Sequence, residues 1–202
     1  MALKFANNNS LSAITALPAS VSGGAWTLLS TQTASSSATL SFTSGINSTY
    51  KEYIFRIINV HPATDSVDFQ FNLSVDTGSN YNVTKTSSYF RSFHFEDDSG
   101  QGVTYQPNED LAQGTGFQNL SDRIDNDNDG SCSGILHLFD PSSTTFVKHF
   151  VSRFNRSFGD DPVTADDFMT GYGNTTSAVD AVQFKFSSGN IDSGVIKLYG
   201  VS

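Results

Sequence analysis

The chain has few of the residues on which most enzyme sites are built. It contains one cysteine, Cys132, and only four histidines, which are scattered along the sequence. A single cysteine excludes an intrachain disulfide and every metal site that needs several thiolates. The sequence also lacks a Gly-x-Ser-x-Gly elbow, a glycine-rich phosphate loop and a His-Glu-x-x-His pattern. We therefore expect a protein that is not an enzyme and that has no cofactor, calcium excepted.

Basic residues are also scarce. Lys and Arg number 11 against 20 Asp and Glu, which gives a net charge of −9, and no basic cluster occurs. Nucleic acids and anionic membrane surfaces need such clusters, so neither is an expected partner. No apolar run approaches the roughly 20 residues that span a bilayer, and the N-terminus lacks the apolar region of a secretory signal. We expect no membrane insertion and synthesis in a cytoplasm.

The apolar mass of the chain comes largely from 17 Phe and 7 Tyr, while charged residues make up only 15%. Aromatic and β-branched residues with a neutral polar surface favour stacked sheets over helices. From Trp26 onward, strand signals recur at short intervals between turn residues. The predicted strands are Trp26 to Thr33, Ala38 to Phe42, Tyr53 to Val60, Val67 to Val75, Tyr89 to Phe95, Ile135 to Phe139, Thr145 to Phe154, Phe168 to Tyr172, Ala181 to Phe186 and Gly194 to Tyr199.

The clearest alternation is in the strand from Val67 to Val75, where every second residue is apolar. Short antiparallel strands without helices between them predict an all-β, jelly-roll-like antiparallel β-sandwich. We assign it to one domain, residues 25–202, preceded by an extended N-terminal arm, residues 1–24. The arm is more apolar than a solvated tail requires, so it either orders against a partner or is a frayed terminus.

Two predicted strands, Tyr53 to Val60 and Thr145 to Phe154, carry apolar residues on both faces or aromatic residues among charges. One face of a sandwich strand covers the core, so apolar residues on the other face indicate a second contact. We expect that contact to be the arm or a neighbouring subunit.

A polar stretch from Glu96 to Ser133 interrupts the strands. Its part from Glu96 to Asp129 has nine acidic residues and one basic residue, Arg123. The stretch is too long for an ordinary hairpin loop, and long loops often carry function. We expect this acidic segment to be exposed and to face outward, because its charges repel one another.

Within this segment, Asp125, Asp127 and Asp129 alternate with asparagines and are followed by Gly130, which matches the opening of a calcium loop. The twelfth position of that register is Leu136, where an EF-hand has a bidentate Glu. The three aspartates are therefore either calcium ligands in another type of loop, with Asp122 as a further ligand, or residues of a solvated turn.

Two adjacent carboxylate pairs, Asp160-Asp161 and Asp166-Asp167, could in principle serve glycoside hydrolysis. Adjacent carboxylates in a loop rich in Gly and Pro are ordinarily solvated turn residues. We expect that plainer role here, which disfavours a carbohydrate-active enzyme.

The C-terminal sequence from Ser187 to Gly200, SSGNIDSGVIKLYG, resembles the C-terminal signature of small β-sandwich virion proteins of tailed bacteriophages, particularly marine phages. The resemblance extends to Thr27 to Ser37 and Phe139 to Phe150. It implies a class of protein and no site, because none of these motifs has a known chemical role.

The resemblance implies a non-enzymatic structural protein of the virion, and two roles are compatible with it. A capsid decoration or cement protein would bridge neighbouring shell subunits with its arm and one sheet face. A tail fibre or receptor-binding module would instead bind host surface glycans with its loops. The sequence lacks coiled-coil heptads and shaft repeats, which favours decoration. We expect a homotrimer that contacts the major capsid protein or tail proteins.

Overall fold

The computed structural model describes residues 25–158 and 162–202, and all of its regular elements in those ranges are β-strands. The arm predicted for residues 1–24 lies outside the described residues, as do Asp160 and Asp161, so the division into arm and domain stays a prediction. In the described part of the chain, no helix is long and apolar enough to cross a membrane.

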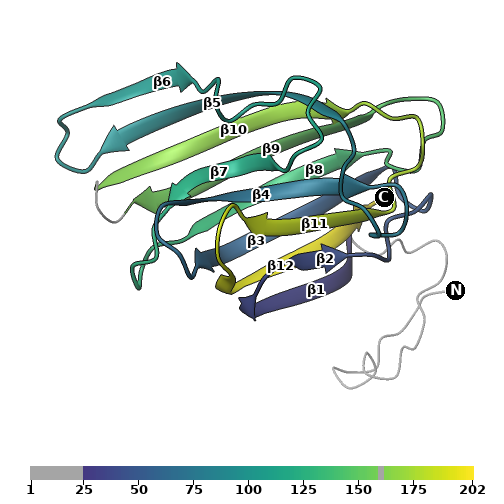
Figure 1. The fold of residues 1–202 in the computed structure, drawn as a ribbon, viewed down its shortest axis with the longest axis horizontal. Coiled ribbons are helices and arrows are strands. Elements are labelled where there is room, and N and C mark those ends of the chain that lie inside the picture. Colours follow the sequence, from purple (N-terminus) through teal and green to yellow (C-terminus); the bar gives the residue numbers. More distant parts are fainter. Residues whose placement is uncertain (1–24, 159–161) are drawn as a thin grey trace, which may run out of the picture.

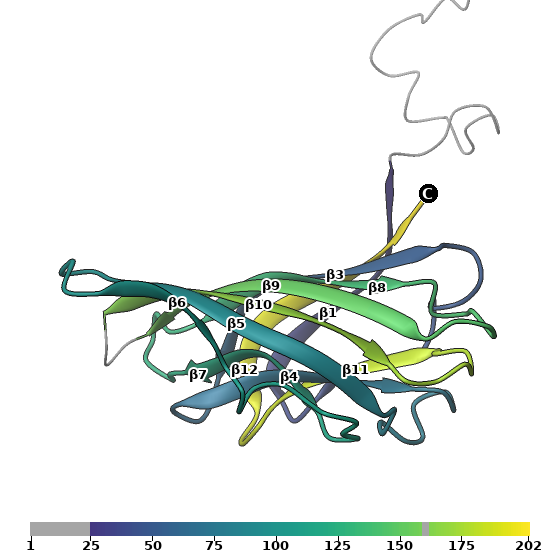
Figure 2. The ribbon, with the colours of Figure 1, turned by 90° about the horizontal axis from the view of Figure 1, so that it is seen from above.

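The strands form two antiparallel sheets that lie one above the other (Figures 1 and 2). In spatial order, the large sheet consists of β1 (Trp26–Ser37), β12 (Ile191–Val201), β3 (Glu52–Pro62), β8 (Cys132–Phe139), β9 (Lys148–Phe158), β10 (Val163–Gly173), β5 (Lys85–Phe95) and β6 (Gln101–Tyr105). The small sheet consists of β2 (Leu40–Phe42), β11 (Ala181–Phe186), β4 (Val67–Ser74) and β7 (Gln118–Ile124). The predicted all-β antiparallel sandwich is confirmed.

The strand order is that of a jelly roll with two inserted hairpins. Without β5, β6, β9 and β10, the two sheets have the orders β1-β12-β3-β8 and β2-β11-β4-β7. Strands at equivalent positions in these orders are consecutive in the chain, as expected when a long double-stranded ribbon rolls up into two Greek keys. The β5–β6 and β9–β10 hairpins both join the edge next to β8, and they widen the large sheet by four strands.

The core lies between the sheets and is largely aromatic. On β4, Val67, Phe69, Phe71 and Leu73 are buried, as the predicted alternation requires. The alternation ends after Phe71, because Asn72 and Ser74 of the predicted wet face are buried too and Val75 is exposed. Phe71 contacts Phe150 of the large sheet with ring centroids 5.2 Å apart. Each such buried side chain contributes roughly 2 kcal/mol to folding before chain entropy is counted. Aromatic contacts between the layers therefore hold the sandwich together.

All ten predicted strands overlap strands of the structure, but the stretch from Glu96 to Ser133 is not one long loop. It contains β6, β7 and the first residues of β8. The expectation that its acidic part faces outward is wrong for Asp122 and Asp125, which are 2% and 4% exposed. Asp122 is buried because it lies on the core-facing side of β7, the edge strand of the small sheet, where it pairs with Arg91 and Arg156 of the large sheet. Asp125 directly follows β7.

Candidate functional site

Four charged side chains meet between the sheets beside β7. Arg91 on β5, Arg156 on β9 and Asp167 on β10 come from the large sheet, while Asp122 comes from the small sheet. All four are buried, and Asp167 is completely inaccessible. Strand alternation positions them, because each is on the inner face of its strand.

The four groups form ion pairs with one another, and Arg123 Nε also donates to Asp122 Oδ2 at 3.2 Å. Arg91 donates from Nε to Asp167 Oδ1 at 2.8 Å and from Nη2 to Asp122. Arg156 donates from Nη2 to Asp122 Oδ1 at 2.9 Å and from Nε to Asp167 Oδ2 at 3.3 Å. Ser121 Oγ donates to Asp167 Oδ2 at 2.8 Å. The cluster therefore joins β7 of the small sheet to three strands of the large sheet.

The electrostatics of the cluster favour permanent charges. Burial alone would raise the pKa of Asp122, but Arg156 and Arg91 outweigh it and hold that pKa below its ordinary value. Burial alone would lower the pKa of Arg91, but Asp167 and Asp122 raise it instead. Burial also raises the pKa of the nearby Cys132 thiol. The shifts of Asp122 and Arg91 keep both side chains charged, and a thiol with a raised pKa is a poor nucleophile, so these three groups do not suit acid–base or nucleophilic catalysis.

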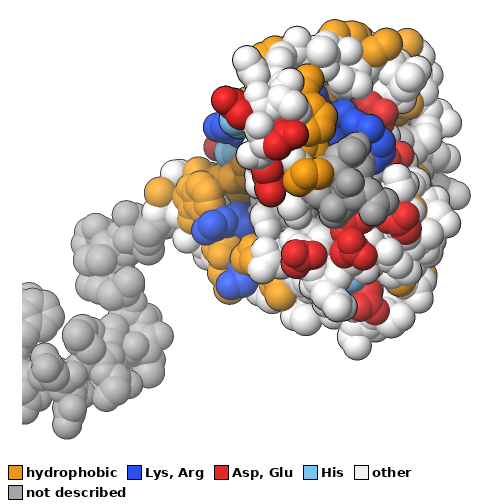
Figure 3. All heavy atoms as spheres, turned by 90° about the vertical axis from the view of Figure 1, so that its left-hand side faces the viewer, with side chains coloured by type: hydrophobic (Ala, Val, Ile, Leu, Met, Phe, Trp, Pro, Cys, Tyr) orange, Lys and Arg blue, Asp and Glu red, His pale blue; other side chains and the backbone are white. Residues whose placement is uncertain are grey.

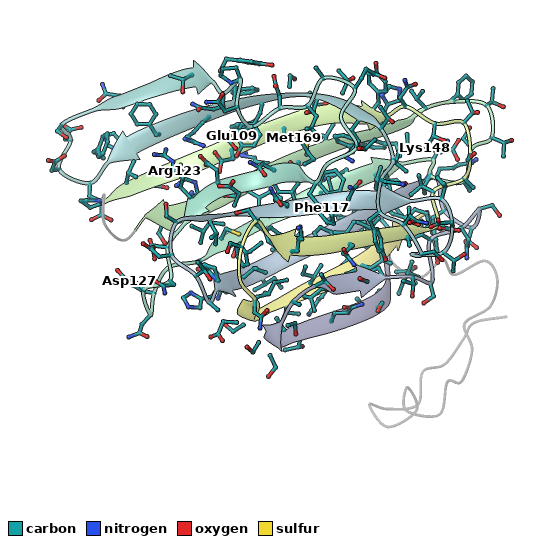
Figure 4. The ribbon with its side chains drawn as sticks, viewed as in Figure 1. Glu109, Phe117, Arg123, Asp127, Lys148 and Met169 are labelled. Carbon is teal, nitrogen blue, oxygen red and sulfur yellow. The ribbon has the colours of Figure 1, made fainter. Side chains whose placement is uncertain are left out.

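A hollow of about 300 Å³ opens beside the cluster. It is lined by Arg91, Phe93, Phe95, Thr104, Gln106, Arg123, Arg156, Val163 and Ala165. Arg123 lies towards the same end of the molecule as Asp127, opposite to Lys148 (Figure 4). At this end, Lys and Arg side chains gather beside hydrophobic ones, with acidic side chains around them (Figure 3). Guanidinium groups beside phenyl rings can hold an anionic ligand with an apolar face.

The expected role of Asp166 and Asp167 as solvated turn residues is wrong. Both lie in β10, where strand alternation sends them to opposite faces of the large sheet. Asp167 belongs to the buried cluster, and Asp166 accepts hydrogen bonds from Arg153 on the outer face. No sequence pattern indicated this, because the arginine partners lie on other strands, 11 to 76 residues away in the chain.

The three aspartates of the calcium hypothesis follow β7. Asp125 is buried and its Oδ1 accepts a hydrogen bond from the Asp127 amide at 3.2 Å, whereas Asp127 and Asp129 are exposed. Among the described residues, no group of three or more His, Cys, Asp or Glu side chains is arranged to hold a metal ion. The calcium site stays a prediction.

A second notable surface is the outer face of the large sheet, which is the upper side in Figure 2. Ten large hydrophobic side chains of the described residues are exposed, and all but Val75 and Phe146 lie on this face. The eight are Trp26, Leu28, Ile58, Phe90, Val103, Tyr105, Phe139 and Val151. Apolar residues gathered on one face mark an interaction surface.

Two lysines, Lys85 and Lys148, are buried, and no sequence pattern indicated this. Lys85 Nζ donates to Asn72 Oδ1 at 2.5 Å and to the Val83 carbonyl at 2.8 Å. Burial lowers the pKa of Lys85 to about 7. Lys148 Nζ donates to three carbonyl groups, those of Ser143, Phe146 and Thr175, and burial lowers its pKa too. Both ammonium groups are held by uncharged oxygens, which fits a structural role.

Comparisons of the chain with protein-family models, with curated proteins and with solved structures found no match.

Proposed function

We propose that the protein is a non-enzymatic structural protein of a tailed-phage virion, and that it decorates the capsid by packing the outer face of its large sheet against neighbouring subunits. The observation that carries the proposal is the concentration of exposed hydrophobic side chains on that face. Large exposed apolar surfaces are rare in proteins unless a partner covers them, so this face is expected to have a partner.

The size of the face supports this role. Eight strands spaced about 4.8 Å apart span roughly 34 Å, and strands of 11 residues extend for about 37 Å. The face therefore exceeds the roughly 800 Å² that each partner contributes to a standard interface. It has room for copies in a homotrimer and for a shell protein. The paired charges and buried thiol of the ion cluster support the non-enzymatic part of the proposal.

Labelling the protein on intact particles tests the location. Antibody labelling followed by electron microscopy should mark the capsid, in many copies per particle. Label confined to the tail would overturn the decoration role. Light scattering of the purified chain at micromolar concentration tests assembly, and a monomer there would count against self-association through the outer face.

A tail fibre or receptor-binding module is the second candidate. The hollow lined by arginine and phenylalanine side chains favours it, because acidic host glycans offer both a carboxylate and an apolar ring face. Label on the tail, together with binding of an acidic sugar by the purified chain, would support this role over decoration.

A further inference from the structure

Two cations face each other on the outer face of the large sheet. Lys197 on β12 pairs in register with Arg56 on β3. Like charges directly opposite each other in a sheet repel and destabilise it. Neither side chain forms an ion pair with a carboxylate of the described residues. The fold itself therefore gives no reason for this pair, whereas an anionic partner from outside would.

A shallow hollow of about 670 Å³ adjoins this pair. Trp26, Arg56, Ile57, Ile58, Ser133, Gly134 and Ile135 line it. Trp26 is the only tryptophan of the chain and is 42% exposed, with its ring 5.7 Å from that of Tyr199. An exposed tryptophan beside an arginine in a hollow is typical of the residues that dominate binding energy at protein interfaces.

The chain itself carries the complementary charge. The turn between β5 and β6 holds Glu96, Asp97 and Asp98, all exposed, and the Asp98 side chain is 87% accessible. Figures 1 and 2 place this turn at the extreme end of the molecule, away from β1 and β12. The turn therefore cannot reach the hollow of its own chain, but the turn of a second copy can.

We propose that the hollow around Trp26 and Arg56 receives the acidic β5–β6 turn of a second copy of this chain. The contact joins two different surfaces, so it is head-to-tail, and repeating it around an axis closes a ring. A two-fold dimer would make the contact twice, and where each pair of copies makes it once, a homotrimer is the smallest closed ring. The inference rests on the proposed assembly through the outer face and names the contact that orients the copies.

Charge reversal on the full chain tests the contact. Arg56→Glu should raise the concentration of half-assembly at least about tenfold, which corresponds to about 1.4 kcal/mol, because it replaces an attraction across the contact by a repulsion. The double variant Asp97→Lys/Asp98→Lys should do the same. Combining these three substitutions with Lys197→Glu should restore assembly, because the pair at the hollow is then acidic, the turn has net positive charge, and the two surfaces are complementary again.

Matched controls come from exposed charges elsewhere. Lys51→Glu removes a cation that pairs with Asp140, and Asp127→Lys changes an acidic turn next to β7. Both variants should assemble as the unmodified chain does. Light scattering measures the mass of the assembly, and the emission of Trp26 should shift to the blue as concentration rises, because a tryptophan buried in a contact loses water. Since Trp26 is the sole tryptophan, the signal reports the hollow directly.

The outcomes separate this contact from the broader proposal. A trimer that persists in every variant would overturn the contact and leave assembly through the outer face standing. A chain that remains monomeric at about 100 μM would overturn both. Loss of assembly with Arg56→Glu that the Asp97→Lys/Asp98→Lys variant does not reproduce would refute the acidic turn as the occupant.

Discussion

Lys85 makes the stability of the sandwich depend on pH in an unusual direction. Its side chain is completely buried between the sheets, and burial lowers its pKa from 10.5 to about 7. Between these two values the unfolded chain binds a proton that the folded chain has lost. Stability therefore rises with pH across this window and is lowest where the folded protein must bury an ammonium group, below about pH 7.

The magnitude follows from the size of the shift. Each pKa unit corresponds to about 1.4 kcal/mol, so the full window amounts to roughly 4 to 5 kcal/mol. This is an upper bound, because the hydrogen bonds from Lys85 Nζ to Asn72 and Val83 favour the charged form. Replacing Lys85 by Met removes the titration. Asn72 Oδ1 still accepts a hydrogen bond from the Leu73 amide in that variant.

Urea unfolding of the unmodified protein and of Lys85→Met, between about pH 6 and about pH 10, measures the effect. The difference in unfolding free energy between the two isolates Lys85, because every other titrating group is common to both proteins. It should be flat below about pH 7 and should then shift in favour of the unmodified protein by up to about 1.4 kcal/mol per pH unit. A difference that stays constant over the whole range would refute the reasoning and show that the amine remains charged.

Three further predictions concern other parts of the fold. Asp167→Asn should lower the unfolding free energy by about 3–5 kcal/mol in urea unfolding, because it leaves a buried guanidinium with too little compensating charge. The control is Asp166→Asn, at the adjacent and more exposed aspartate, which should cost at most about 1 kcal/mol in the same assay. Gly194→Ala should lower the unfolding free energy by more than about 1 kcal/mol, since Gly194 has a φ of +124° and a Cβ there would lie 2.7 Å from the Val60 Cα. An unchanged midpoint of urea unfolding would contradict this. A chelator should leave the thermal midpoint unchanged, because Asp125 already binds the backbone of its own turn, and a drop of several degrees would instead establish a metal.

The strands of the jelly roll could be predicted because the sequence signals for strands and turns are local. Alternation along β4 depends only on neighbouring residues, and Phe69 and Phe71 appear on the dry face as expected. Turn residues between the strands are local signals too. β7 was missed because its sequence, QNLSDRI, has few apolar residues. Its polar side chains are buried against partners that lie far away in the chain, so no local period reveals the strand.

The same limit applies to single side chains. Asn72 belongs to the predicted wet face of β4, yet it is buried because Lys85, 13 residues later, donates to it. Cys132 raised no structural expectation beyond the missing disulfide, and it lies in the core beside the ion cluster. In each case the environment is set by a strand pairing or a sheet contact that composition and spacing do not contain.

The two inserted hairpins connect these observations. They widen the large sheet by four strands and supply three of the four charged residues in the buried cluster, Arg91, Arg156 and Asp167. A jelly roll without them would have no need of these charges. Buried ion pairs seldom stabilise a fold more than well-packed apolar residues do. We infer that the cluster instead favours the observed alignment of β7 on the widened sheet, because its arginines and carboxylates pair in that alignment. Arg91 lies on β5, so the same ion pairs hold the hairpin whose turn carries the acidic residues proposed to meet a second copy.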